Sequence, residues 1–160
     1  MSEESLCVET TSPAETLTWG TKLGEALGGG AIVALVGPLG AGKTMLVKGI
    51  AVGNSAGDPR QVVSPTFTLI HEYAGRLVLF HLDAYRLRSA AELAALGFDE
   101  LIGADSAVAI EWADRVAALV PNDALWIELA VTGDQSRRLT FRATGPTAAT
   151  CLNALRSAPR

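Results

Sequence analysis

The sequence of 160 residues is poor in the side chains that build metal sites and disulfide scaffolds. It has two cysteines, Cys7 and Cys151, which stand near opposite ends, and two histidines, His71 and His81. Neither pair has the spacing of a zinc site or of a disulfide framework. We therefore expect neither feature, and we expect a reducing compartment. The two histidines are most simply interpreted as strand residues with satisfied hydrogen bonds.

Positive charge is also scarce. The chain has 13 lysines and arginines against 17 acidic residues, which gives a net charge of −4. The lysines are only three, Lys22, Lys43 and Lys48, and the arginines are scattered. A protein that grips the nucleic-acid backbone needs clustered basic side chains. Strong direct binding of nucleic acid is therefore not expected.

Long apolar runs are missing as well. The longest, at residues 31–36, is far shorter than the roughly 20 residues that span a bilayer. The acidic N-terminus, residues 1–5, shows no signal-peptide pattern, so we expect a cytoplasmic protein with no membrane role. With 49% hydrophobic and 19% charged residues the composition is globular. We expect one domain over residues 1–160, with a core at about 11–143 and a tail, 144–160, that carries no usable motif.

Strand and helix patterns alternate along the chain, which is typical of an α/β fold. Capping boxes begin helices after Ser12 and Ser89, and Gly97 suits the end of the second. Two hairpins, at 66–80 and 124–143, would add antiparallel strands to a parallel sheet. The pattern predicts strands at 31–36, 66–73, 77–80, 107–110, 124–131 and 138–143, and further helices at 43–52 and 147–155.

The most specific motif lies at residues 37–44, Gly-Pro-Leu-Gly-Ala-Gly-Lys-Thr, which matches the phosphate loop G-x-x-x-x-G-K-[ST]. Its glycines let backbone N–H groups turn toward phosphate oxygens, and the helix that follows points its positive end at them. Lys43 would bind the β- and γ-phosphates, and the Thr44 hydroxyl would bind Mg²⁺. A dinucleotide fingerprint fails because Met45 stands where it needs glycine. The residues expected to bind ATP here are Gly37, Leu39, Gly40, Ala41, Gly42, Lys43 and Thr44.

Two carboxylates follow apolar strands and are candidates for the metal and for catalysis. Asp83 ends the strand at 77–83 as the acidic residue of a Walker B motif does. Glu111 ends the strand at 107–111 in the same way, and ligands of α/β sheets bind at the carboxyl ends of strands. Glu111 would bind the metal, directly or through water, or orient the attacking water. The alternatives are a turn-forming aspartate and a helix-capping glutamate.

Three further residues are candidates for the nucleotide site. Ser64 and Thr66 flank Pro65 between the phosphate loop and Asp83, where GTPases place a switch loop, although a plain loop entering a strand fits equally. Trp112, beside Glu111, would border the nucleotide or simply pack. The guanine-reading N-K-x-D and D-x-x-G motifs are absent, which favours ATP.

Together these motifs resemble the bacterial TsaE family, formerly YjeE, of P-loop ATPases in tRNA threonylcarbamoyladenosine synthesis. The order and spacing match over about residues 11–142, and the departures, such as Pro38, replace no phosphate or metal ligand. The resemblance is carried by residues 37–44, 63–69 (Val-Ser-Pro-Thr-Phe-Thr-Leu), 81–86 (His-Leu-Asp-Ala-Tyr-Arg), 96–100 (Leu-Gly-Phe-Asp-Glu) and 110–112 (Ile-Glu-Trp).

The resemblance implies a P-loop NTPase-like three-layer sandwich with a mixed central sheet. It implies an ATPase that is weak alone and is stimulated by the TsaD–TsaB heterodimer, which modifies adenosine 37 of tRNA, so contact with tRNA would be indirect. By motif position, Lys43, Asp83 and Glu111 would be catalytic, and Thr44, Glu111 and Asp83 would lie at Mg²⁺. The family pattern also suggests that Arg137 and Thr16 border ATP, and that Thr66 belongs to the switch-like loop.

Two other functions remain open at the level of sequence. A small-molecule P-loop kinase would need an acceptor pocket and a lid with arginines, for which Arg86 and Arg88 are candidates. A nucleotide-sensing adaptor would bind ATP and a partner without turnover. Phosphoryl transfer to a metabolite would favour the kinase, and ATP-dependent partner binding without hydrolysis would favour the adaptor.

Overall fold

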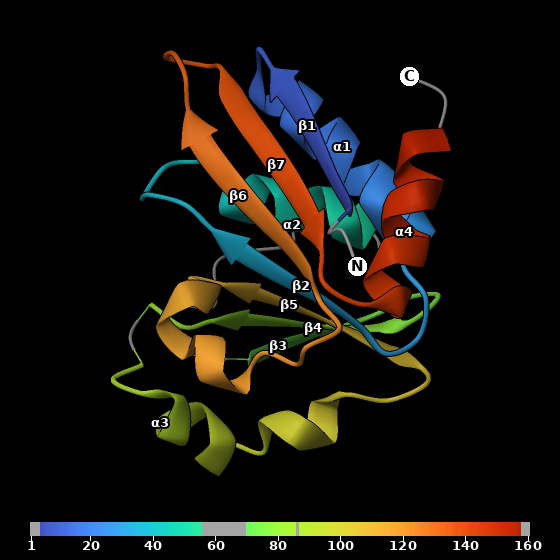
Figure 1. The fold of residues 1–160 in the computed structure, drawn as a ribbon, viewed down its shortest axis with the longest axis vertical. Helices are drawn as coiled ribbons and strands as arrows, with labels where there is room; N and C mark the ends of the chain where they lie inside the picture. Colours follow the sequence, from blue (N-terminus) through green and yellow to red (C-terminus); the bar gives the residue numbers. More distant parts are fainter. Residues whose placement is uncertain (1–3, 56–69, 86, 158–160) are drawn as a thin grey trace.

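A seven-stranded mixed sheet forms the centre of the computed structural model (Figure 1). The structure describes residues 4–55, 70–85 and 87–157. The strand order is β1-β7-β6-β2-β5-β4-β3. The strands are β1 Glu4–Thr10, β2 Ala31–Val36, β3 Ile70–Ala74, β4 Val78–Asp83, β5 Ser106–Glu111, β6 Leu125–Val131 and β7 Arg137–Ala143.

The four inner strands that carry the sequence motifs run in one direction. β2 pairs in parallel with both β5 and β6, and β4 pairs in parallel with β5. The predicted hairpins are confirmed, because β3 is antiparallel to β4 and β7 is antiparallel to β6. The carboxyl ends of β2, β4, β5 and β6 therefore meet at one edge of the sheet, and this edge carries the predicted site.

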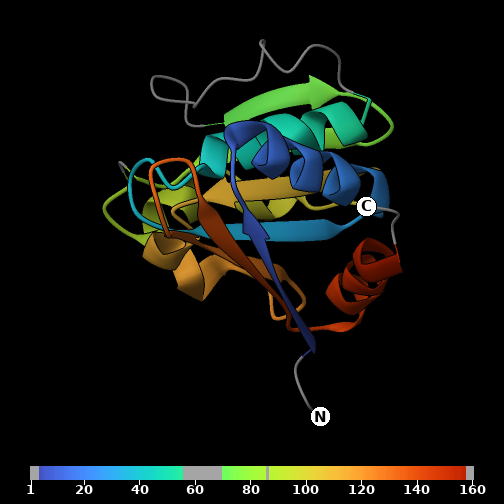
Figure 2. The same ribbon diagram turned by 90° about the horizontal axis from the view of Figure 1, so that it is seen from above.

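Helices cover both faces of the sheet, which confirms the three-layer α/β architecture. In Figure 2, α1 and α2 lie on one side of β2 and β5, and η3 lies on the other. Alternate residues of β2 divide between two apolar cores: Val33 and Leu35 face the α1–α2 side, and Ile32 and Ala34 face the other. The helices are α1 Pro13–Ala26, α2 Lys43–Gly53, α3 Ala90–Ala95, η2 Phe98–Leu101, η3 Ala113–Leu119 and α4 Pro146–Ser157.

The two capping boxes predicted from the sequence differ in their hydrogen bonds. Ser12 caps α1 as expected, with its hydroxyl accepting from the backbone N–H of Glu15 at 3.2 Å. Ser89 precedes α3 but makes no capping hydrogen bond through its side chain. The Glu92 carboxylate accepts instead from the backbone N–H of Arg88. The sequence therefore located the start of α3 correctly but not its hydrogen bonding.

The two ends of the described chain add to the core. β1 extends the sheet beyond β7 and was not predicted, since only Leu6 and Val8 give it an apolar face. α4 packs through Ala148, Leu152 and Leu155, which are buried against the same core as α1 and α2. Among the described residues no helix is long and apolar enough to cross a membrane.

The two cysteines are free thiols in different surroundings. Cys7 is exposed on β1, whereas Cys151 is a buried residue of α4, and burial raises the pKa of its thiol to about 11. A thiol reagent attacks the thiolate and needs access. We expect one fast-reacting thiol in the folded protein and two after denaturation, measured with a chromogenic disulfide reagent. The Cys7→Ser variant should lose the fast phase, and two fast thiols in the folded wild type would contradict this assignment.

Candidate functional site

The phosphate-loop sequence forms a tight turn between the end of β2 and the start of α2. Gly40 and Gly42 adopt φ values of 79° and 100°, which glycine accepts without steric cost. A Cβ atom on Gly37 would lie 2.7 Å from the carbonyl oxygen of Leu129 in β6, so the loop follows the sheet edge closely. Gly42 is also the N-cap of α2, so the positive end of this helix faces the loop.

Lys43 is held inside this turn. Its ammonium group donates to the carbonyl oxygens of Gly37 at 2.6 Å and Pro38 at 2.9 Å. It also lies 3.8 Å from the centre of the Trp112 ring. Burial lowers the pKa of Lys43 below its ordinary value, and the carboxylates of Glu111 and Asp83 act in the opposite direction. The structure thus brings Lys43 and Trp112 together, two of the predicted nucleotide neighbours.

Thr44 and Glu111 meet across the space between α2 and β5. The Thr44 hydroxyl lies 3.0 and 3.1 Å from the two carboxylate oxygens of Glu111. Glu111 is only 3% exposed, and a buried carboxylate needs such donors. Asp83 is the direct neighbour of Glu111 in the β4–β5 register, and its carboxylate also accepts from the backbone N–H of Tyr85. The three predicted metal-binding residues therefore gather at one sheet edge, and Asp83 forms a local turn as well.

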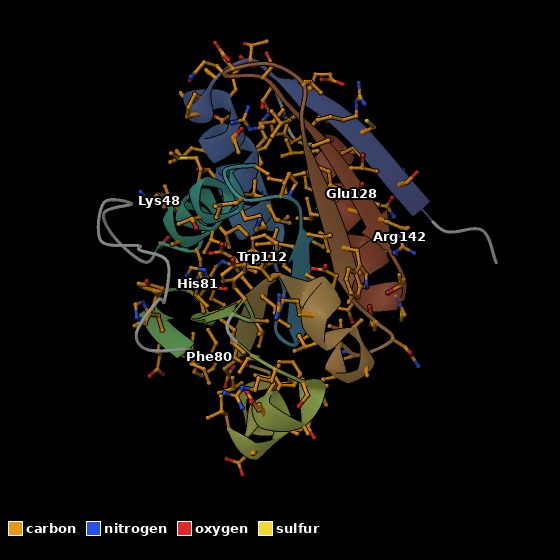
Figure 3. All side chains as sticks on the ribbon, turned by 90° about the vertical axis from the view of Figure 1, so that its left-hand side faces the viewer. Lys48, Phe80, His81, Trp112, Glu128 and Arg142 are labelled. Atoms are coloured by element: carbon orange, nitrogen blue, oxygen red, sulfur yellow. The ribbon has the colours of Figure 1, made fainter. Side chains whose placement is uncertain are left out.

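Trp112 occupies an unusual backbone position at this edge. It has φ 59° and ψ 39° between β5 and η3, a left-handed conformation that is uncommon outside glycine. Its ring stacks obliquely on Tyr85 at 4.9 Å between ring centres. Figure 3 labels Trp112 and His81 on the side of α2 that faces the sheet, with Lys48 on the outer side of that helix. The strained turn thus serves to bring an aromatic ring over Lys43.

A small pocket beside the loop includes two further predicted ATP neighbours. Its volume is about 150 Å³, and it is lined by Thr16 of α1 and Arg137 of β7 together with Gly40 and Gly42. Arg137 donates to the carbonyl oxygen of Gly40 at 3.0 Å. The further lining residues, which were not predicted to contact ATP, are Pro13, Met45 and Gln135.

Some sequence predictions for the site have other outcomes. Ser64, Thr66 and the arginine at position 86 lie outside the described residues. Leu39 projects into solvent with 83% of its surface exposed. His81 lies on β4 as predicted and its Nε2 atom bonds to Glu111, but its Nδ1 atom has no hydrogen-bond partner among the described residues. The available signal was its position two residues before Asp83, which puts both side chains on one face of a strand.

Comparison with known proteins agrees with this geometry. Residues 10–139 match the family model described as threonylcarbamoyl adenosine biosynthesis protein TsaE. The chain is 42% identical to the tRNA threonylcarbamoyladenosine biosynthesis protein TsaE of Treponema pallidum, covering 81% of this chain and 94% of that protein. It is also 42% identical to the Bacillus subtilis protein of that name, covering 72% of each. The crystal structure of Bacillus subtilis YdiB superposes with a TM-score of 0.83 at 32% identity, covering 98% of this chain and 97% of YdiB.

Proposed function

We propose that this chain, which belongs to the TsaE family, supports tRNA threonylcarbamoyladenosine biosynthesis as a Mg²⁺-dependent ATPase activated by partner proteins. One observation carries the ATPase proposal. A phosphate loop presents Lys43 and Thr44 at the carboxyl edge of a parallel sheet, directly against the buried Glu111. Loops of this form bind nucleoside triphosphates through backbone N–H groups and the lysine.

The donor set at this edge fits Mg²⁺. Mg²⁺ prefers oxygen ligands and is usually held by one or two carboxylates together with waters and substrate phosphates. The Thr44 hydroxyl and the Glu111 carboxylate already converge, with Asp83 on the neighbouring strand. These three residues would hold the ion, which would neutralise charge on the phosphates of ATP.

The side chains at this edge would have different roles in ATP binding and hydrolysis. Lys43 would exchange the carbonyl oxygens of Gly37 and Pro38 for phosphate oxygens, since all of these are acceptors for one ammonium group. Glu111 and Asp83 would orient the attacking water or the metal. Trp112 would cover the phosphates from the side on which it now covers Lys43. The pocket between Thr16 and Arg137 would take the nucleoside.

Apolar side chains around the same edge support a protein partner. Leu39 is 83% exposed, Val131 is 52% exposed and Tyr85 is 49% exposed. Leu39 lies in the phosphate loop, Val131 ends β6, and Tyr85 follows β4. Exposed apolar groups that gather at one place are typical of interaction sites. The partner we propose is the TsaD–TsaB heterodimer in the cytoplasm, with tRNA held by the partner complex because this chain is acidic.

The test measures ATP hydrolysis and tRNA modification with purified components. We expect the TsaD–TsaB heterodimer to raise ATP hydrolysis by this chain severalfold, and repeated rounds of tRNA modification to require the chain. Unstimulated hydrolysis together with intact multi-turnover modification in its absence would refute the proposal. Phosphoryl transfer to a metabolite would indicate the kinase alternative. ATP-dependent binding to the heterodimer without turnover would indicate the adaptor.

A further inference from the structure

We propose that His81 is a positioning residue that fixes the Glu111 carboxylate for Mg²⁺–nucleotide binding. The inference rests on the proposed function, because it assigns a role to a side chain behind the proposed metal ligand. Among the described residues, His81 makes no hydrogen bond to the phosphate loop. It acts through Glu111, to which its Nε2 atom bonds at 2.5 Å.

The sheet register explains why these two side chains meet. His81 of β4 lies opposite Ala109 of β5, and Asp83 lies opposite Glu111. Side chains two residues apart share a face, and diagonal neighbours on adjacent strands are within reach of long side chains. His81, Asp83 and Glu111 therefore share the face to which Leu79 and Ala109 belong, and these two pack in the core formed with α2. The contact is a product of the parallel β4–β5 pairing.

Burial makes this contact more than a surface ion pair. His81 is 0% exposed and Glu111 is 3% exposed. A carboxylate in such a place requires hydrogen-bond donors for both oxygens. The Thr44 hydroxyl lies near both carboxylate oxygens of Glu111, but it has only one proton to donate. The His81 ring supplies the second donor, and it fixes the rotation of the carboxylate because the ring is itself immobilised in the core.

The second ring nitrogen of His81, Nδ1, indicates that packing alone does not explain a histidine at this position. His81 Nδ1 is buried and has no hydrogen-bond partner among the described residues. The proton belongs on Nε2, where it is donated to Glu111, because a carboxylate oxygen can only accept a hydrogen bond. An aliphatic side chain, like the neighbouring Leu79 and Leu82, would fill the site without burying a polar nitrogen that lacks a partner. An aliphatic side chain could not supply the N–H donor that His81 has at Nε2.

The first experiment compares two amide variants. The amide nitrogen of glutamine in His81→Gln reaches about as far as Nε2, whereas the shorter asparagine in His81→Asn does not. The readout is the affinity for a non-hydrolysable ATP analogue in Mg²⁺ and in EDTA. Changes to a residue that hydrogen-bonds to a metal ligand commonly cost about 10- to 100-fold in metal affinity. We expect His81→Asn to reduce the gain in affinity from Mg²⁺ by at least about 10-fold, with affinity in EDTA unchanged, and His81→Gln to restore most of it.

The outcomes separate this inference from the function on which it rests. No gain in affinity from Mg²⁺ in the wild-type protein would overturn the proposed function and this inference with it. A wild-type gain that His81→Asn retains would overturn the inference alone. Equal losses in His81→Asn and His81→Gln would also overturn it, because any change of shape would then suffice. In the Glu111→Gln background, His81→Asn should cause no further loss.

A second measurement requires no change at His81. The chain has only two histidines, so ring nitrogen signals in an NMR spectrum are easily assigned. We expect His81 to carry its proton on Nε2, and its Nε2 signal to move in Glu111→Gln and on addition of Mg²⁺ with the ATP analogue. His71 lies directly opposite His81 in the β3–β4 register, with its ring 3.2 Å from the Tyr73 hydroxyl, and its signal should move less than that of His81. A His81 signal that is identical in wild type and Glu111→Gln would overturn the inference.

Discussion

Replacing Lys43 by methionine should reduce ATP hydrolysis at least about 100-fold, the usual cost of losing one preorganised group at a charged transition state. Methionine keeps most of the aliphatic length of lysine but has no charge and no N–H donor. The ammonium of Lys43 sits within the turn of residues 37–42, bound to the carbonyls of Gly37 and Pro38. No other lysine is available at this place, since Lys22 lies on α1 and Lys48 on the outer side of α2.

Lys48→Met is the matched control, because it makes the same exchange five residues further along the same helix. Hydrolysis by this variant should stay within about twofold of wild type, as for a surface change away from the site. Loss of the charge in Lys43→Met should not by itself make the protein unfold more easily. Burial lowers the pKa of Lys43, which means that the folded state disfavours its charged form. Lys43→Met would count against the proposed site if it hydrolysed ATP as fast as Lys48→Met in the presence of the partner complex.

Gly49→Ala should lower the free energy of unfolding by about 2 kcal/mol, and the melting temperature by about 4 to 8 °C. Alanine favours an isolated helix by about 1 kcal/mol over glycine, so the expected sign is opposite to helix propensity. The reason is the crossing of α1 and α2. A Cβ atom at Gly49 would lie 2.2 Å from the backbone oxygen of Leu17 and 2.8 Å from the Cα of Gly20.

The crossing is built from two pairs of glycines, each four residues apart on its helix. Gly20 and Gly24 of α1 face Gly49 and Gly53 of α2, and a Cβ at any of them would lie within 2.3 Å of a backbone oxygen of the other helix. Backbone cannot move aside as a flexible side chain can, so the helices would have to separate. Lys43 and Thr44 begin α2, so this separation should also weaken ATP binding.

Gly28→Ala provides the control for this prediction. Gly28 follows the end of α1, and a Cβ there would meet nothing within 4 Å. Its free energy of unfolding should change by less than about 0.5 kcal/mol. Thermal melts and urea titrations of the three proteins would measure the difference. Equal stabilities for Gly49→Ala and Gly28→Ala would mean that the helices tolerate the wider spacing.

The groups of the candidate site could be predicted from the sequence because they depend on local patterns. The residues at 37–44 encode both a turn that only glycines allow and the helix that follows it, and the apolar strands before Asp83 and Glu111 mark the edge where their side chains emerge. The family, the α/β class and the two hairpins followed from the same patterns. The edge strand β1 was not predicted because its apolar pattern consists of only two residues.

What the sequence alone determined was the set of groups: a phosphate loop, two strand-end carboxylates and a tryptophan beside one of them. Only the tertiary structure decided which of them meet. Glu111 and Thr44 are 67 residues apart, and Glu111 and His81 are 30 apart. These contacts depend on the order and register of β2, β5 and β4 and on how closely the glycines let α2 approach α1. Such distances are set by the packing of the whole sheet and its helices, and no local pattern carries that information.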